Sequence, residues 1–165
     1  MPTSHIHATQ AIVGEPEVLE DAGLARSGVR FSTNVRAGDR LLADADHLHR
    51  ILLNLLKNAR QAVTTPEQKV PGQVRLDYSQ DGVSSVLRIV DNGPGVPNRA
   101  LDRLFTPFSG SGRPGGTGLG LAISRELAQA HGGDLVLQKT GSEGSVFEVI
   151  LPGVLPPLSR PRKKA

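Results

Sequence analysis

The sequence of 165 residues contains no cysteine and no tryptophan, and its aromatic side chains are one tyrosine and four phenylalanines. Without cysteine, the chain can form neither a disulfide framework nor a thiolate metal site. So few aromatic side chains leave little surface on which nucleic-acid bases could stack. We therefore expect no nucleic-acid partner.

Long apolar runs are also missing. No stretch approaches the roughly 20 consecutive apolar residues that a membrane-spanning helix needs, and the first residues lack the apolar centre of a secretory signal. We expect a cytoplasmic chain that makes no membrane contact of its own. The length is that of one domain with a real hydrophobic core, and we expect a monomer in isolation.

Charge is nearly balanced, since 19 Lys and Arg against 16 Asp and Glu give a formal net charge of +3. Basic residues gather near the C-terminal end, in Arg160-Pro161-Arg162-Lys163-Lys164. Such a tail is either a solvated end or a contact for the phosphates of nucleic acid or membrane. We divide the chain into a lead-in segment (residues 1–27), one domain (28–152) and a basic, Pro-rich tail (153–165).

One long helix stands out. Its apolar residues recur at intervals of three and four, at Leu48, Ile51, Leu52, Leu55, Leu56, Ala59 and Val63. Asp44 or Asp46 can cap its start, and Pro66 ends it. Shorter helices are predicted after Pro97 and over residues 117–130, where a glycine pair stops the second one. Residues 18–25 could form one further helical turn.

Strand patterns account for much of the rest. The predicted strands are residues 29–35, 41–43, 73–79, 84–90, 135–138 and 146–151, the third and fourth joined as a hairpin around Asp81-Gly82. The last two strands form another hairpin. About six strands with about three helices on one face of a mixed, mostly antiparallel sheet predict an α+β two-layer sandwich.

Two amides lie on the long helix one turn apart, at Asn54 and Asn58, and therefore share a face. An amide oxygen is a suitable ligand for Mg²⁺ when phosphates supply most of the negative charge. Taken alone, the pair is more simply explained as surface or capping amides.

A carboxylate, Asp91, follows the apolar run of residues 86–90. At the end of a central strand it can accept a hydrogen bond from the amino group of adenine, and Gly93 and Gly95 let the backbone approach the ring. Val96 would form a wall of that pocket. The same run, Asp-Asn-Gly-Pro-Gly, is also good turn chemistry.

Residues 110–117 nearly spell a P-loop, but Gly116 occupies the place of the required lysine. Gly116, Gly118 and Gly120 do not have the spacing of the dinucleotide fingerprint either, and no strand immediately precedes them. What remains is a mobile lid over residues 109–116 that leads into a helix N-terminus, where free N–H groups favour phosphate. Arg113, the only cation in this lid, is either a phosphate contact or a solvated loop charge.

Together and in this order, Asn54-Leu55-Leu56-Lys57-Asn58-Ala59, Asp91-Asn92-Gly93-Pro94-Gly95 and Gly115–Leu121 resemble the N, G1 and G2 boxes of a known domain. It is the ATP-binding (GHKL-type) domain of bacterial sensor histidine kinases. Phe105 and Phe108 stand at its F box. The resemblance covers roughly residues 28–152 and implies the same two-layer fold.

The resemblance also implies a site for ATP and Mg²⁺. Asn58 would be the metal ligand and Asn54 would support the metal and phosphates. The remaining implied nucleotide contacts are Asp91, Gly93, Gly95, Val96, Arg113, Gly116, Thr117, Gly118, Leu119, Gly120 and Ser145. Ser145 stands where related ATPases place Ser or Thr beside the adenine-binding carboxylate.

Relatives of the gyrase, Hsp90 and MutL types carry a glutamate, which activates water, one turn before the metal asparagine. Here that place holds Asn54, which cannot act as a base. This difference favours phosphoryl transfer to a nucleophile on another domain, which needs mainly positioning and charge neutralisation. The resemblance therefore implies an ATP-dependent protein-histidine kinase of two-component signalling. Its partners would be a histidine-bearing dimerisation domain and a downstream response regulator.

The sequence departs from the family in two ways. Gln61 and Ala62 replace the lysine–aromatic pair that follows the metal asparagine in many sensor kinases, which leaves Arg60 or Arg113 as substitute cations. None of the five histidines lies in an acceptor-type helix, so we expect the acceptor outside this chain. Two alternatives stay open: a nucleotide-binding module without catalysis, and an anti-sigma-type serine kinase on the same fold.

Overall fold

The computed structural model describes residues 10–12, 16–36, 38–107, 120–154 and 156. Its main sheet has five strands in the spatial order β2 (Arg30–Thr33), β4 (Gln73–Gln80), β5 (Ser84–Asp91), β7 (Gly144–Pro152) and β6 (Asp134–Gly141). β2 is parallel to β4, and the other neighbours are antiparallel. A two-stranded sheet pairs β1 (Gln10–Ile12) with β3 (Arg40–Leu42).

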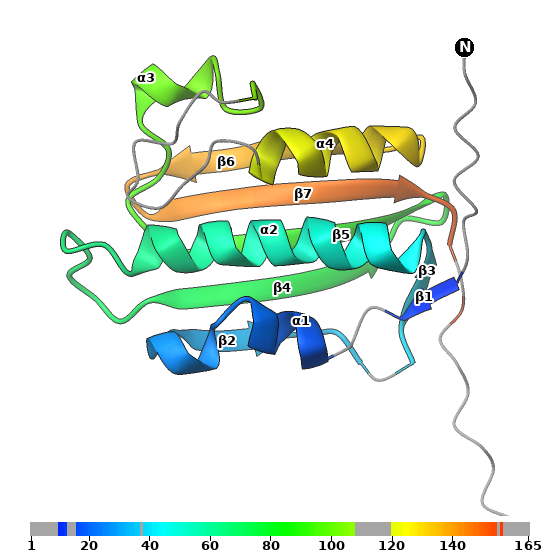
Figure 1. Cartoon of the computed structure of the whole chain (residues 1–165), viewed down its shortest axis with the longest axis horizontal. Coiled ribbons are helices and arrows are strands. Elements are labelled where there is room, and N and C mark those ends of the chain that lie inside the picture. Colours follow the sequence, from blue (N-terminus) through cyan, green and yellow to red (C-terminus); the bar gives the residue numbers. More distant parts are fainter. Residues whose placement is uncertain (1–9, 13–15, 37, 108–119, 155, 157–165) are drawn as a thin grey trace, which may run out of the picture.

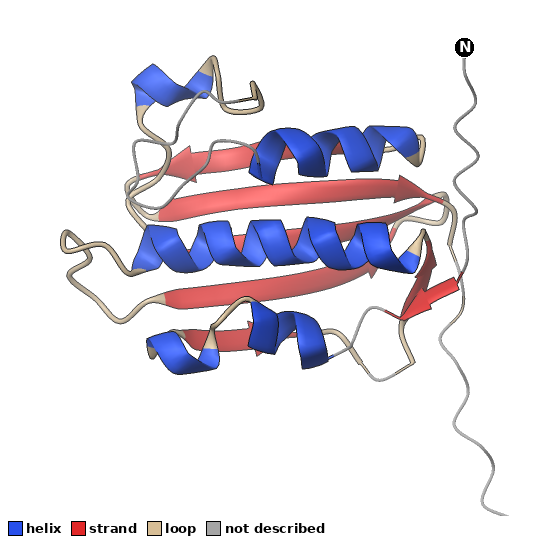
Figure 2. Ribbon diagram, viewed as in Figure 1, coloured by secondary structure: helices blue, strands red, loops and turns tan. Residues whose placement is uncertain are grey.

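Helices cover one face of the main sheet, as Figures 1 and 2 show for α1 (Pro16–Asp21), α2 (Ala45–Val63) and α4 (Gly120–Ala130). A short 3-10 turn, η1 (Ala25–Ser27), follows α1, and α3 (Asn98–Leu101) follows β5. The predicted two-layer sandwich with a mixed, mostly antiparallel sheet is confirmed. None of the described helices combines the length and the apolar character that crossing a membrane requires.

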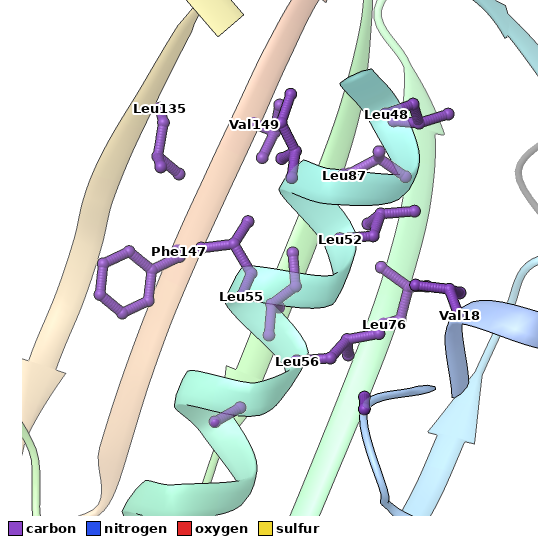
Figure 3. Close-up of a cluster of buried hydrophobic side chains, with 14 of the residues drawn as sticks. Val18, Leu48, Leu52, Leu55, Leu56, Leu76, Leu87, Leu135, Phe147 and Val149 are labelled. Atoms are coloured by element: carbon purple, nitrogen blue, oxygen red, sulfur yellow. The ribbon is translucent and has the colours of Figure 1, made fainter. Parts of the chain in front are cut away.

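The core lies between α2 and the sheet. Strands β5 and β7 alternate strictly, so every second side chain faces the helices and is buried. These side chains meet the apolar face of α2, in a cluster that includes Leu52, Leu55, Leu87, Phe147 and Val149 (Figure 3). The apolar face of the helix and the apolar faces of the two strands, which the sequence periods indicate, therefore form one buried core.

The predicted hairpin around Asp81-Gly82 is confirmed. The Asp81 Oδ1 atom accepts hydrogen bonds from the N–H groups of Val83, at 2.9 Å, and Ser84, at 2.6 Å. Gly82 has a φ of +90°, which glycine adopts without strain. The hydrogen bond from Ser84, followed by that from Val83, lowers the pKa of the Asp81 carboxyl group.

The described strands and helices differ from the prediction mostly in extent. The last hairpin spans residues 134–141 and 144–152 and is longer than expected. The helical turn expected near residues 18–25 is present as α1, slightly earlier in the chain. β1 was not predicted, because three residues are too few for a strand pattern to emerge. Residues 117–119 of the predicted last helix lie outside the described residues.

Part of the segment that we expected to be a lead-in packs on the core. Val18, Ala22 and Leu24 are each no more than 4% exposed and belong to the main buried cluster. The Ala22 carbonyl accepts a hydrogen bond from Arg60 Nε on α2 at 2.9 Å. Residues 16–27 are thus packed against the domain in this structure, while the division at residues 28 and 152 stays a prediction.

The start of α2 is joined to the end of α4 through His131. Its Nδ1 atom lies 2.7 Å from the Leu127 carbonyl, and its Nε2 atom accepts the Asp44 N–H at 3.1 Å. A carbonyl only accepts and a backbone N–H only donates, so these partners require the neutral imidazole protonated on Nδ1. The Asp44 carboxylate in turn accepts the His47 N–H at 3.0 Å and caps α2.

We predict that Asp44→Ala lowers the free energy of unfolding by about 1 kcal/mol, because it removes the cap acceptor. The hydrogen bond from the His47 N–H also lowers the pKa of the Asp44 carboxyl group below 3.8. A lowered folded-state pKa contributes stability that is complete above the unfolded-state pKa and lost as the pH falls through the folded-state value. Urea unfolding near neutral pH and at several acid values measures both effects.

Asp44→Asn is the matched control, since it keeps a cap acceptor and removes the titrating group. It should resemble the wild type near neutral pH and lose less stability than the wild type under acid conditions. The same acid dependence in both proteins would show that the Asp44 carboxylate contributes nothing to it.

Candidate functional site

The candidate site lies where β5 ends and β7 begins. Asp91, the last residue of β5, is directly opposite Ser145 in the antiparallel register. Both side chains face the helices, and they are only 5% and 4% exposed. Two residues that the sequence assigned to one pocket from positions far apart in the chain are therefore cross-strand neighbours.

The Asp91 carboxylate is oriented by the turn that follows it. Its Oδ1 atom accepts the Gly93 N–H at 2.9 Å, within a buried environment. The turn chemistry that the sequence offered as one alternative is therefore present at this residue, while the contact with adenine stays a prediction.

Glycine is required around this turn because backbone segments touch there. A Cβ on Gly93 would lie 2.9 Å from the Ala62 carbonyl oxygen on the last turn of α2. A Cβ on Gly95, where φ is +85°, would collide with the carbonyl of Gly141. Gly144, with φ +130°, is packed in the same way against the carbonyl of Asp91. The sequence explained Gly93 and Gly95 by a close ligand, whereas the structure shows close backbone neighbours.

A chain of hydrogen bonds joins Val96 to Ser145 through Thr140. The Val96 N–H donates to Thr140 Oγ1 at 2.8 Å, and Thr140 Oγ1 lies 2.8 Å from Ser145 Oγ. Val96, the expected pocket wall, is therefore tied to the residue opposite Asp91. Sequence reasoning did not single out Thr140, because an isolated threonine in a strand has no distinguishing pattern.

The two asparagines of α2 lie above this end of the sheet. Asn54 Nδ2 donates to the Gly120 carbonyl at 3.3 Å and to Ser124 Oγ at 3.2 Å, which joins α2 to the first turn of α4. Asn58 is half-buried and lies one turn before Ala62, whose carbonyl packs against Gly93. Asn58 is therefore at the end of α2 nearest to the Asp91 turn, and Asn54 is next to Gly120.

Ser124 and Asn92 were also missed by sequence reasoning. Ser124 is fully buried and accepts the Asn54 hydrogen bond. Asn92 holds the turn after β5 to the start of β4, since its Oδ1 accepts the Gln73 N–H at 2.8 Å and its Nδ2 donates to the Pro71 carbonyl at 3.0 Å. A serine on the buried face of a predicted helix was the available signal for the first contact, and the place of Asn92 in the Asp-Asn-Gly-Pro-Gly run was the signal for the second.

Phe105 lies at the edge of the core. Its ring packs edge-on against Phe147, with centroids 6.5 Å apart, and Arg125 Cζ is 4.8 Å from its centroid. Arg125 Nε also binds Asp134 at 3.1 Å. Phe105 is thus in contact with the core.

Several expected contacts cannot be placed. Phe108, the predicted lid over residues 109–116 with Arg113, and the run Gly116, Thr117, Gly118 and Leu119 lie outside the described residues. Gly120, the last of the expected phosphate contacts, is the first described residue of α4.

The described part of the chain offers no acidic cluster for a metal ion. Within the described ranges, no group of three or more His, Asp or Glu side chains could hold a metal ion. A site that relies on an amide ligand and on the phosphates of a nucleotide needs no such group, because the ligand supplies the charge. The donor set therefore fits a metal carried with phosphates.

Comparison with known proteins agrees with this geometry. Residues 43–154 match the family described as histidine kinase-, DNA gyrase B-, and HSP90-like ATPases. The chain is 37% identical to sensor protein TdiS of Thauera aromatica over 107 residues. This match covers 64% of this chain and 19% of TdiS. It is 33% identical over 135 residues to sensor histidine kinase ZraS of Escherichia coli K12, which covers 82% of this chain and 28% of ZraS.

A third relative is the alginate biosynthesis sensor protein KinB of Pseudomonas aeruginosa, 34% identical over 127 residues, which covers 74% of this chain and 20% of KinB. The chain thus spans only 19% to 28% of the length of these three relatives.

Solved structures show the same fold. The mycobacterial sensor histidine kinase MprB superposes with a TM-score of 0.72 at 29% identity, covering 92% of this chain and 99% of that structure. The nucleotide-free catalytic domain of histidine kinase ThkA superposes with a TM-score of 0.68 at 24% identity, covering 88% of this chain and 95% of that structure.

We predict that Gly95→Ala destabilises the protein much more than Gly82→Ala. Both glycines have a positive φ, so each alanine pays about 1–2 kcal/mol of backbone strain. Only at Gly95 does the added Cβ also collide with a backbone carbonyl, whereas nothing lies within 4 Å at Gly82. Gly95→Ala should therefore cost at least about 3 kcal/mol in urea unfolding. Equal costs would refute the close packing against Gly141.

Proposed function

We propose a function on the premise that the chain belongs to the family of histidine kinase-, DNA gyrase B-, and HSP90-like ATPases, as an ATP-binding catalytic domain of the histidine kinase type. The proposal is that this domain transfers the γ-phosphoryl group of Mg-ATP to a histidine on a separate dimerisation domain. The observation that carries the proposal is the buried Asp91 carboxylate at the end of a central strand, oriented by the Gly93 N–H. A downstream response regulator would then receive the phosphoryl group.

Adenine would bind at the Asp91 end. A carboxylate is an acceptor only, so it pairs with the exocyclic amino group of adenine and not with the carbonyl that guanine carries there. Gly93 and Gly95 would supply backbone next to the base, Val96 a pocket wall, and Ser145 a hydroxyl beside the carboxylate. The support is the cross-strand pairing of Asp91 with Ser145 and the hydrogen bond of Val96 to the same hairpin.

The phosphates would bind between α2 and the start of α4. Asn58 would hold Mg²⁺ through its amide oxygen, and Asn54 would support the phosphate side. A bound Mg²⁺ would neutralise phosphate charge. The N-terminus of α4 at Gly120 offers N–H groups and a favourable dipole. Arg113 and the Gly116, Thr117, Gly118 and Leu119 run are proposed to close over the phosphates, on the evidence of the sequence alone.

Asn54 argues against efficient hydrolysis. A neutral amide cannot accept a proton from water, and its Nδ2 already donates to Gly120 and Ser124. The arrangement positions ATP without activating water, so the attacking group must come from outside the site. A histidine imidazole is such a nucleophile, and its attack requires mainly alignment and charge neutralisation.

The wider context is also a proposal. We propose that residues 28–152 form the catalytic unit, with residues 1–27 leading into it and residues 153–165 as a basic tail. We further propose that the unit is monomeric in isolation, binds neither nucleic acid nor membrane by itself, and works in the cytoplasm, because its proposed substrate is ATP.

We predict that Asn58→Ala weakens Mg-ATP binding by roughly tenfold or more and abolishes transfer, while binding of adenosine without Mg²⁺ is unchanged. The reason is that Asn58 would act through the metal and phosphates and not through the base. Calorimetry with both ligands tests this. Lys57→Ala is the matched control, since Lys57 is the exposed neighbour on the same helix. Equal losses for adenosine and Mg-ATP would show that the helix has merely been damaged.

We predict that the chain alone neither labels itself nor hydrolyses ATP appreciably, but phosphorylates a histidine on a supplied dimerisation hairpin. None of its histidines has an acceptor-type sequence, and Asn54 replaces the glutamate that would activate water. The assay uses radiolabelled ATP with the domain alone and then with candidate hairpins from histidine kinases.

The chemistry of the label decides between the alternatives. Acid-labile, base-stable label on the hairpin supports a phosphohistidine. Acid-stable label on serine would instead indicate a serine kinase of the anti-sigma type. Tight ATP binding without transfer to any authentic partner would indicate a regulatory module that only binds nucleotide.

A further inference from the structure

We propose that Thr140 is a positioning residue for adenine recognition, which acts by holding Ser145 and Val96 around the Asp91 carboxylate. The inference rests on the proposed function and deepens it, because it assigns part of the base specificity to a residue on β6, which is separated from β5 by β7 in the sheet. Its basis is a pair of hydrogen bonds and an irregularity in β6.

The hydroxyl of Thr140 serves two segments of the site at once. The Val96 N–H can only donate, so Thr140 Oγ1 is its acceptor, at 2.8 Å. The same oxygen lies 2.8 Å from Ser145 Oγ and still has its own proton to share with it. A single hydroxyl therefore contacts both the Val96 backbone and the Ser145 hydroxyl.

Ser145 is where this orientation matters. It lies opposite Asp91 in the register between β5 and β7, and both side chains are buried on the helix-facing side. A hydroxyl held by Thr140 at a defined angle can donate to, or accept from, a ligand next to the carboxylate. A serine without that restraint would populate several rotamers, and the pocket would lose discrimination between bases.

An irregularity in β6 brings Thr140 into this position. Leu137 pairs with Phe147, but Lys139 pairs with Val146, so one extra residue is inserted between them. In an uninterrupted ladder Lys139 would oppose Ser145 and face the helices. The bulge moves Thr140 into that place, opposite Ser145. Bulges next to binding sites often re-aim a side chain in this way.

The test compares near-isosteric variants of the full chain. Thr140→Val replaces the hydroxyl with a methyl group, and we expect the Kd for ATP to rise roughly tenfold, with a matching rise for adenosine and a smaller preference for ATP over GTP. Thr140→Ser restores the hydroxyl and should bind within about threefold of the wild type. If the valine variant does not fold, Thr140→Ala provides the same measurement without a second branch on Cβ.

Thr33→Val is the matched control. The Thr33 hydroxyl also joins two backbone groups, since it accepts the Val35 N–H at 3.0 Å and donates to the Leu76 carbonyl at 2.6 Å. It lies on β2 at the opposite edge of the sheet from β6. We expect Thr33→Val to change the free energy of unfolding and to leave nucleotide affinity and base preference as they are.

A double-mutant cycle tests whether Thr140 acts through Ser145. If it does, Thr140→Val and Ser145→Ala together should weaken ATP binding by less than the product of their separate effects. Independent, multiplicative effects would overturn the inference. So would a Thr140→Val variant with reduced stability but wild-type affinity and ATP preference, because that result describes a merely structural residue.

The inference and the proposed function fail in different ways. If the wild-type chain does not bind ATP, or if Asp91→Asn leaves its affinity and base preference unchanged, the proposed adenine pocket and this inference are both overturned. If the wild type and Asp91→Asn behave as proposed while Thr140→Val binds like the wild type, only the role of Thr140 is overturned.

Discussion

The candidate site depends on the close contact of three backbone segments, the turn after β5, the turn between β6 and β7, and the last turn of α2. Gly93 lies against Ala62, Gly95 against Gly141, and Gly144 against Asp91, each too close for a Cβ. Contacts between backbones involve no rotatable side chains, although ordering a glycine backbone costs more conformational entropy than ordering that of any other residue. The result is a carboxylate whose direction is set by the fold itself, at the edge of a well-packed core.

Helix α2 links this site to the rest of the molecule. Its apolar face closes the core, and its polar face carries Asn54 and Asn58 one turn apart. Asn54 binds the first turn of α4, while the helix start is held to the end of α4 through His131. Both ends of α4 are therefore held to α2 by hydrogen bonds. The proposed phosphate contacts on the two helices are thus fixed relative to each other.

Much of this architecture was predictable because the signals are local. The apolar period of α2 and the Asp81-Gly82 turn determine their elements within a few residues. The position of Thr140 was not predictable, since strict alternation along β6 places Lys139 opposite Ser145, and only the bulge puts Thr140 there instead. The contact of His131 with Asp44 joins residues 87 positions apart and leaves no trace in either local pattern.

The pairing of β5 with β7 has a consequence for the order of folding. Asp91 belongs to a hairpin with β4 that can close as soon as both strands exist, because its contacts are local. Its other neighbour, Ser145, arrives 54 residues later along the chain, together with the glycines that fit the turn. On the ribosome, synthesis proceeds from the N-terminus, so the first strands can associate well before Asp91 has its cross-strand neighbour Ser145. The last step in that order is the docking of the β6–β7 hairpin onto the β4–β5 pair, which brings Ser145 beside Asp91.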